Sequence, residues 1–235
     1  HLSTWMAYEF ESNSGIHIDA ISKDVRTVLT REEVEFGKST IRNLRQNGRK
    51  PVVIIAPYSN TKNRNLPRRT LNDVVNGISE FSVPCLLEPF GQDQYIEGTI
   101  PIGDKSLRNA SAILYASDSY LGVDSGPLHM IMGALQGTSE DLGSGLNLSA
   151  NKIIVALGSS HSIVSAYPEN RIVSATGDCS IAPCGIHGYH SIESASEHFR
   201  TKIYGTKDPE KDKSGCNYVD YSDMRQAALD IFYQN

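Results

Sequence analysis

One short stretch combines the residue types that bind anionic groups at the start of a helix. Asp124, Ser125, Gly126 and Pro127 follow an apolar run and precede a predicted helix that carries His129. The backbone N–H groups of the first helical turn, the Ser125 hydroxyl and the positive end of the helix dipole would converge there. Gly126 allows a ligand to approach the backbone closely, and Pro127 suits a first-turn position. The pattern predicts a diphosphate site.

The same residues also have an ordinary structural interpretation. Aspartate, serine and proline are common at helix starts for capping alone. A single histidine such as His129, on an otherwise apolar helix, is more often a hydrogen-bonded core residue than a catalyst. Both interpretations stay open at this point.

Two further polar segments follow predicted strands. The first contains Ser59, Lys62 and Arg64, and the second contains Glu88 and Gln92. Ligands of open α/β sheets bind beyond the carboxyl ends of the strands, so either Lys62 or Arg64 could contact a phosphate. Glu88 and Gln92 could hydrogen-bond ribose hydroxyls or a base edge. A solvated loop and an ordinary turn explain the two segments equally well.

The cysteines are too few for a disulfide scaffold in a chain of 235 residues. They are Cys85, Cys179, Cys184 and Cys216. His187 and His190 lie between the last two, and thiolates with a histidine would suit zinc. Free thiols are the alternative.

The elements that would position these residues alternate between strand and helix. Short apolar runs predict strands at 52–57, 85–87, 120–123, 153–157 and 172–173. Amphipathic runs predict helices at 70–81, 107–114, 127–135 and 223–233, and a capping box at Thr30 and Glu33 starts an earlier helix that ends near Gly48. Composition predicts loops at 137–151 and 205–215.

This alternation predicts an α/β fold, namely a Rossmann-like, doubly wound parallel sheet with an N-terminal helical arm and a C-terminal helix. We expect the arm to cover residues 1–50, the nucleotide-binding domain residues 51–215 and the C-terminal helix residues 216–235.

Charge and hydropathy restrict the partners. The net charge of −5 gives no basic footprint for nucleic acid. No apolar run approaches the roughly 20 residues that span a bilayer. We therefore expect a cytoplasmic protein, with peripheral attachment to a membrane through its acceptor as a further option.

The chain from Thr30 to about Cys184 resembles the C-terminal half of family 9 glycosyltransferases, the lipopolysaccharide heptosyltransferases of GT-B fold. Four features carry the resemblance, in order: IIAPYSNTKNRNLP before an amphipathic helix, LLEPFGQ at a strand end, KSLRNASAILYASDSYLGVDSGPLHMIMGAL, and CSIAPC. The third is the most specific, because an Asp-Ser/Thr-Gly-x-x-His element lies beneath the sugar nucleotide in that family.

The resemblance implies inverting transfer of a heptose or hexose from a nucleoside diphosphate sugar to a glycan or protein acceptor. Ser125, Gly126 and either Lys62 or Arg64 would hold phosphates, while Asp124 and His129 would orient the sugar or the loop. Catalysis would need no divalent ion. Autotransporter heptosyltransferases hold iron with a cysteine cluster in this region, so iron joins zinc as a structural option for Cys179, Cys184 and Cys216.

The chain also departs from the family. Arg64-Asn65-Leu66-Pro67 stands where the family has a lysine before Trp-Pro. The family's N-terminal domain, which binds the acceptor and supplies the general base, has no counterpart, so we expect it on a missing domain or a partner chain. Two other functions stay open: a nucleotide-sugar epimerase of GT-B type and a non-catalytic GT-B-like scaffold.

Overall fold

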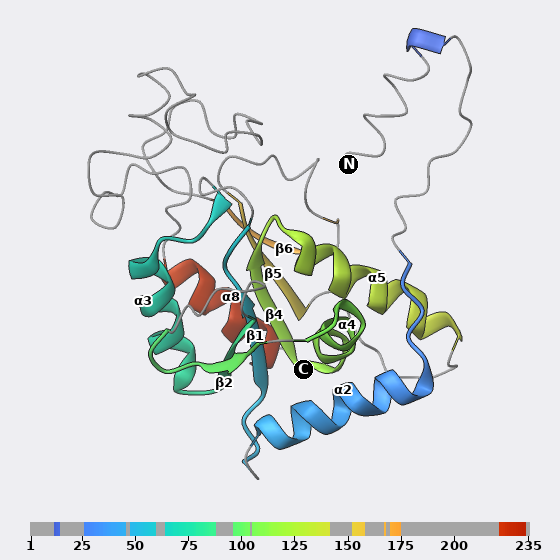
Figure 1. The fold of residues 1–235 in the computed structure, drawn as a ribbon. Coiled ribbons are helices and arrows are strands. Elements are labelled where there is room, and N and C mark those ends of the chain that lie inside the picture. The colour runs from blue at the N-terminus through green and yellow to red at the C-terminus, as the bar shows by residue number, and fades with distance from the viewer. Residues whose placement is uncertain are drawn as a thin grey trace.

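The computed structural model shows an α/β fold built on one parallel sheet (Figure 1). It describes residues 12–14, 26–45, 48–59, 64–87, 96–103, 105–141, 152–157, 167, 170–174 and 221–233. The sheet has six strands in the order β3-β2-β1-β4-β5-β6, and each neighbouring pair is parallel.

The predicted strands and helices are all present among the described residues, in the predicted order, together with one further strand, β3. The strands are β1 (Val52–Ala56), β2 (Val83–Leu87), β3 (Ile100–Ile102), β4 (Ser119–Val123), β5 (Ile153–Leu157) and β6 (Arg171–Ser174). The helices are α2 (Arg31–Leu44), α3 (Arg68–Ser79), α4 (Leu107–Ala116), α5 (Gly126–Asp141) and α8 (Tyr221–Tyr233).

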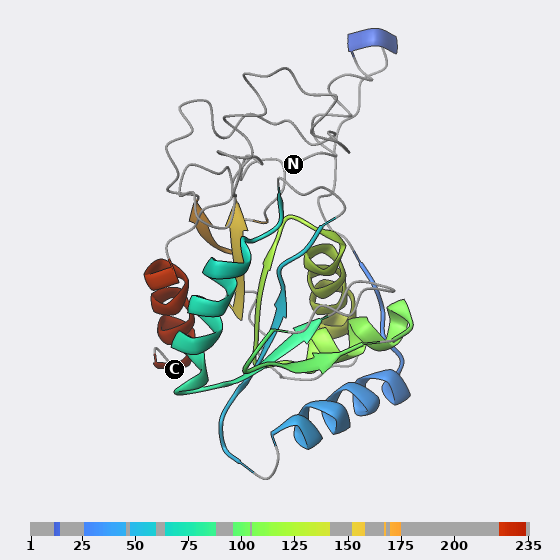
Figure 2. The same ribbon diagram turned by 60° about the vertical axis from the view of Figure 1, so that its left-hand side comes forward.

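Helices cover both faces of the sheet (Figures 1 and 2). On one face lie α4 and α5, with α2 outside α4, and on the other lie α3 and α8. Along β1, Ile54 joins the first apolar layer and Ile55 the second. β1, β4 and β5 are buried along their whole length, and their sequences are apolar apart from Ser119 at the start of β4, as is usual for parallel strands covered on both faces. The strand order and the two covered faces confirm the predicted doubly wound fold.

Two helix starts have the caps expected from the sequence. The Thr30 hydroxyl accepts a hydrogen bond from the Glu33 N–H at 3.2 Å, while the Glu33 carboxylate accepts one from the Thr30 N–H at 2.8 Å. Ser106 caps α4 by accepting from the Asn109 N–H at 3.2 Å. Glu33 also pairs with Arg108, so the capping box ties α2 to α4.

Helix α5 is longer than the sequence suggested. Composition predicted a loop from Gly137 onward, but the helix continues to Asp141, so that boundary is wrong. Gly137 serves a close contact rather than a turn, because a Cβ there would lie 2.8 Å from the Thr27 backbone. Beside it, the Thr138 hydroxyl accepts from the Leu29 N–H at 3.1 Å. The segment before α2 therefore packs against the last turns of α5.

Strand β3 was not predicted. It is only three residues long, it lies at the edge of the sheet, and its middle residue is Pro101. Proline cannot donate to a neighbouring strand and so is tolerated on an edge strand. Neither its length nor its composition gives a strand signal.

An ion pair at the amino-terminal edge of the sheet joins the segments that enter β1 and β4. Arg45 donates through one nitrogen to both carboxylate oxygens of Asp118, at 2.6 and 2.7 Å. Asp118 also accepts the Val52 N–H at 2.7 Å. The buried amine of Lys152 donates to two carbonyl oxygens at the end of α4, at 2.9 and 2.6 Å. These contacts hold the segments at the amino-terminal edge of the sheet in place.

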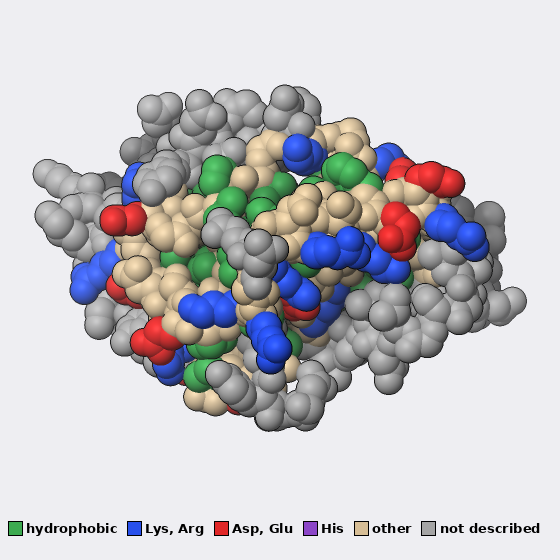
Figure 3. Space-filling view, turned by 90° about the horizontal axis from the view of Figure 1, so that it is seen from below, with side chains coloured by type: hydrophobic (Ala, Val, Ile, Leu, Met, Phe, Trp, Pro, Cys, Tyr) green, Lys and Arg blue, Asp and Glu red, His purple; other side chains and the backbone are tan. Residues whose placement is uncertain are grey.

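The surface at this end carries Lys and Arg side chains between small hydrophobic areas (Figure 3). Arg42, Arg49 and Lys50 are among the exposed ones. Within the described residues, no helix combines the length and the apolar character that crossing a membrane requires.

Candidate functional site

Two central strands end side by side and send the chain to opposite faces of the sheet. β1 and β4 pair with Ala56 opposite Gly122. After β1 the chain continues to α3 on one face, whereas after β4 it enters α5 on the other. Open α/β sheets bind ligands in the crevice that such a switch leaves beyond the strand ends. The structure brings Ser59 and Arg64 to this edge from one side and residues 124–129 from the other.

Arg64 reaches across this edge from the β1 side to the β4 side. Its Nη1 donates to the backbone carbonyl of Asp124 at 3.0 Å and to the Asp124 carboxylate at 3.3 Å. The side chains of Arg64 and Asp124 are only 20% and 11% exposed. The contact places a guanidinium beside the start of α5, in a position partly withdrawn from water.

The start of α5 is open on one side. Ser125 is buried, and its hydroxyl donates to the Val123 carbonyl at 3.3 Å, a long hydrogen bond. Gly126 is exposed, and apart from its neighbours in the chain and the helix backbone, no atom of the described residues lies within 4 Å of the position that a Cβ would take. An anion that entered this space would meet backbone N–H groups at the positive end of a 16-residue helix.

His129 lies one turn into α5. Its Nδ1 is 2.8 Å from the Tyr167 hydroxyl, and the two rings meet edge to face with centroids 5.8 Å apart. Burial lowers the pKa of His129, the Asp124 carboxylate partly opposes that shift, and the Arg64 cation adds to it. The imidazole is therefore neutral near pH 7, with Nδ1 engaged and Nε2 left to donate to or accept from another group.

Sequence reasoning missed Tyr167. It is buried, and Asn170 holds it by accepting from its N–H at 3.1 Å and donating to its carbonyl at 3.0 Å. Tyr167 follows β5, the strand next to β4, so the rule that sites lie beyond strand ends could have pointed to it. The nine residues between it and the end of β5 removed that signal.

Several predicted site residues lie outside the described residues, so their roles stay predictions: Lys62, Glu88, Gln92, Cys179, Cys184 and Cys216. Ser59 is described, and its N–H donates to the Asn65 side chain at 2.6 Å, which holds the loop after β1. No group of three His, Cys, Asp or Glu residues in the described part of the chain could hold a metal ion.

The described groups form a mixed donor and acceptor set. Arg64 and the start of α5 supply positive charge and N–H donors, which favour phosphate oxygens. Asp124 and the neutral His129 supply groups that can hydrogen-bond hydroxyls. Such a set suits a ligand that carries both anionic and hydroxyl groups.

Known proteins match this chain in structure but not in sequence. No family model matches the sequence, and no curated protein sequence matches it. A solved structure of a family 9 glycosyltransferase from Veillonella parvula matches with a TM-score of 0.57 and 12% identity, over 93% of this chain and 56% of that one. The dodecameric, iron-containing heptosyltransferase TibC, in complex with ADP-D-β-D-heptose, matches with a TM-score of 0.52 and 13% identity, over 79% of this chain and 46% of that one.

These likenesses show the fold. The chain has a fold like that of family 9 glycosyltransferases, and it spans about half the length of both solved structures.

Proposed function

We propose that this chain is the donor-binding half of a glycosyltransferase, and that the edge where β1 and β4 end binds a nucleoside diphosphate sugar. One observation carries the proposal: Arg64 contacts Asp124 beside a helix start that is open over Gly126. The fold adds support, because the two similar structures are glycosyltransferases and one of them is in complex with a nucleotide sugar.

In this proposal the donor half binds and positions rather than forming covalent bonds. The diphosphate would lie against the first turn of α5, with Arg64 or Lys62 and the Ser125 hydroxyl as its partners. Asp124 and His129 would meet sugar hydroxyls. As the bond to the sugar breaks, negative charge grows on the departing diphosphate, and fixed N–H donors and cations stabilise that charge without reorganising. This chemistry requires no divalent ion from the protein.

We further propose that the acceptor and the general base are held elsewhere, either in a second domain or on a partner chain. The chain matches only 56% and 46% of the two similar glycosyltransferases, which supports this division. The donor half alone should then bind the nucleotide sugar without transferring it, since general-base help alone is worth roughly a hundred- to ten-thousandfold in rate.

Titration calorimetry with UDP-, GDP- and ADP-sugars tests the proposal. A GT-B-type epimerase would bind a UDP-sugar and invert a sugar carbon, which NMR of the recovered nucleotide sugar would show, whereas a non-catalytic scaffold would give no heat with any of the three. Binding without turnover, followed by transfer once the acceptor half is added, is the result that we expect.

Gly126→Val is the sharpest variant for this site. Because a Cβ at residue 126 would have open space around it, the protein should fold normally while the new methyl groups occupy the space proposed for the diphosphate. Leu107→Val is the matched control, since Leu107 is 72% exposed at the first position of another helix, α4. Equal donor affinity in folded Gly126→Val and wild type would refute the proposed position of the ligand.

A further inference from the structure

A buried hydroxyl lies directly behind the proposed donor site without a hydrogen-bond partner. Tyr120 belongs to β4 and is fully buried, and its hydroxyl has no partner among the described residues. Tyr120 and Gly122 face the same side of the sheet, two residues apart. A Cβ on Gly122 would lie 2.2 Å from the Tyr120 hydroxyl, so that oxygen occupies the space where Gly122 lacks a side chain.

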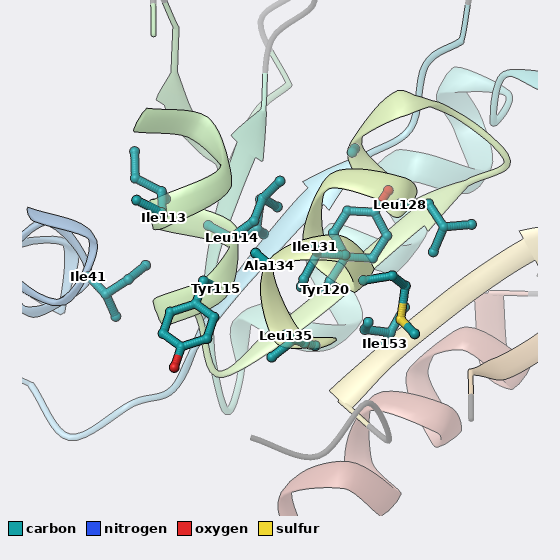
Figure 4. Close-up of a cluster of buried hydrophobic side chains, with 14 of the residues drawn as sticks. Ile41, Ile113, Leu114, Tyr115, Tyr120, Leu128, Ile131, Ala134, Leu135 and Ile153 are labelled. Atoms are coloured by element: carbon teal, nitrogen blue, oxygen red, sulfur yellow. The ribbon is translucent and has the colours of Figure 1, made fainter. Parts of the chain in front are cut away.

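The position of this hydroxyl follows from the apolar layer around it. The Tyr120 ring packs beneath α5 with Leu128 and Ile131 (Figure 4). A buried hydroxyl without a partner costs free energy, about 1–3 kcal/mol, and most proteins avoid it. A phenylalanine would fill the same space without that cost. The unpaired oxygen therefore points to a partner that the described residues do not supply.

Ser125 is the hydroxyl within reach. The Tyr120 hydroxyl fills the space beside Gly122, and the Ser125 hydroxyl contacts the carbonyl of the next residue, Val123. Burial raises the pKa of Tyr120, and the Ser125 side chain opposes that shift, which agrees with this placement. The two hydroxyls do not form a hydrogen bond of normal geometry, since the Tyr120 hydroxyl has no partner among the described residues, whereas the Ser125 hydroxyl donates to the Val123 carbonyl at 3.3 Å. One long bond to the backbone thus holds the Ser125 hydroxyl, and rotation of this side chain would change both the group to which it donates and the direction from which its oxygen accepts.

We propose that Tyr120 is a positioning residue for the donor site, which acts through Ser125. When the Ser125 hydroxyl turns to donate to a phosphate oxygen, its own oxygen becomes the acceptor for the Tyr120 O–H. Binding then exchanges one long hydrogen bond for two shorter ones, and the buried phenol gains its partner only in the complex. This inference rests on the proposed function, because it requires an anion at the start of α5.

The proposal makes stability and affinity respond in opposite directions. Tyr120→Phe removes an unpaired buried hydroxyl, so the melting temperature should stay the same or rise. The same change removes a donor that acts only in the complex, so the affinity for a nucleoside diphosphate should fall roughly three- to tenfold. A purely structural tyrosine would change stability and affinity together or leave affinity alone.

Tyr115→Phe is the matched control. Tyr115 lies in the same apolar cluster, is equally buried, and also has a hydroxyl without a partner among the described residues, but it belongs to α4 rather than to the strand that leads into the site (Figure 4). Its substitution should leave the melting temperature the same or higher and the affinity unchanged.

The experiment measures melting temperature and calorimetric affinity for ADP, GDP and UDP in five proteins: wild type, Tyr115→Phe, Tyr120→Phe, Ser125→Ala and the Tyr120→Phe/Ser125→Ala double variant. The expected result is a weaker complex in Tyr120→Phe and no further loss when this change is added to Ser125→Ala.

Three outcomes would overturn the inference while wild type still binds a nucleotide. They are an unchanged affinity in Tyr120→Phe, an equal loss in Tyr115→Phe, and a full additional loss in the double variant. If wild type binds none of the three nucleotides, the proposed function itself fails.

Discussion

Two arginine–aspartate pairs bridge the same two strands at opposite ends of the sheet. Before β1 and β4, Arg45 binds both carboxylate oxygens of Asp118 at 2.6 and 2.7 Å. After β1 and β4, Arg64 meets Asp124 at 3.0 and 3.3 Å, and the shorter contact is to the backbone. The second pair has the poorer geometry although its side chains are the more buried, at 20% and 11% exposed against 38% and 28%.

The comparison separates a structural pair from a pair suited to a ligand. Withdrawing charges from water is costly, and close hydrogen bonds are needed to offset that cost. The Arg45–Asp118 pair is partly exposed, so withdrawing its charges from water costs little free energy. Its short hydrogen bonds and the Val52 N–H donor offset that cost. The pair at the carboxyl edge has longer bonds between its two residues in a drier place, and it lies beside the helix start where we propose that the diphosphate binds.

The largest effect should come from breaking the structural pair. Asp118→Ala removes an ion pair that solvent partly screens, and it leaves the N–H of the buried Val52 without its acceptor. We expect a loss of about 3 kcal/mol in the free energy of unfolding, measured in urea, with donor affinity unchanged. A variant that lost donor affinity while keeping its stability would reverse the roles of the two ends.

Breaking the other pair should change affinity instead. Arg64→Ala should weaken binding of a nucleoside diphosphate about ten- to a hundredfold if Arg64 is the phosphate contact, since a charge-assisted hydrogen bond is worth about 1.5–3 kcal/mol. Lys62→Ala tests the alternative contact, and Arg45→Ala is the control at the far end of the sheet. If calorimetry detects no loss of affinity in Arg64→Ala and none in Lys62→Ala, neither side chain contacts the phosphates, and the Arg64–Asp124 pair is structural.

A smaller effect should appear with pH at the carboxyl edge. Burial lowers the pKa of His129 from 6.5, so the unfolded chain binds this proton more readily than the folded one. The contribution to stability is fully present above pH 6.5 and is lost as pH falls through the lowered pKa. Urea unfolding at about pH 7.5 and about pH 5.5 should show a smaller loss in His129→Gln than in wild type. Identical pH dependence in both proteins would mean that His129 is not held neutral.

Metal removal should have the smallest effect on donor binding, because neither of the two arginine–aspartate pairs includes a cysteine. The sequence predicts that Cys179, Cys184 and Cys216 hold iron or zinc, or else stay as free thiols. Elemental analysis of protein purified without added metal distinguishes these options, and a chelator should lower stability but not donor affinity if a metal is bound. Metal content near zero, with stability unchanged by chelator, would leave free thiols.

The sequence predicted the framework of the sheet well because its signals are local. The apolar run at residues 52–57, the capping box at Thr30 and the Ser106 cap each depend on neighbours within a few residues. The prediction that a loop starts at Gly137 was wrong for the opposite reason. The role of Gly137 depends on its close contact with Thr27, which is distant in sequence and close in space.

The site was predictable only in part, for the same reason. The strand-end rule placed Arg64 and residues 124–129 at one edge, since that rule needs only the order of elements. It could not give the Arg64–Asp124 contact or the hydrogen bond between Tyr167 and His129, which depend on the paths of loops. Nor could it show that the Tyr120 hydroxyl would lack a partner, because the pattern of β4 reports burial and not hydrogen bonding.

The close fit of Tyr120 against Gly122 also restricts the order in which this strand can evolve. A Cβ at residue 122 would lie 2.2 Å from the phenol oxygen and 2.4 Å from the ring carbon that carries it, so Tyr120→Phe alone makes no room. Any lineage that gains a side chain at residue 122 must first replace the aromatic ring at residue 120 by something smaller. Substitutions at residues 120 and 122 should therefore occur together among related proteins, with the substitution at residue 120 as the earlier one.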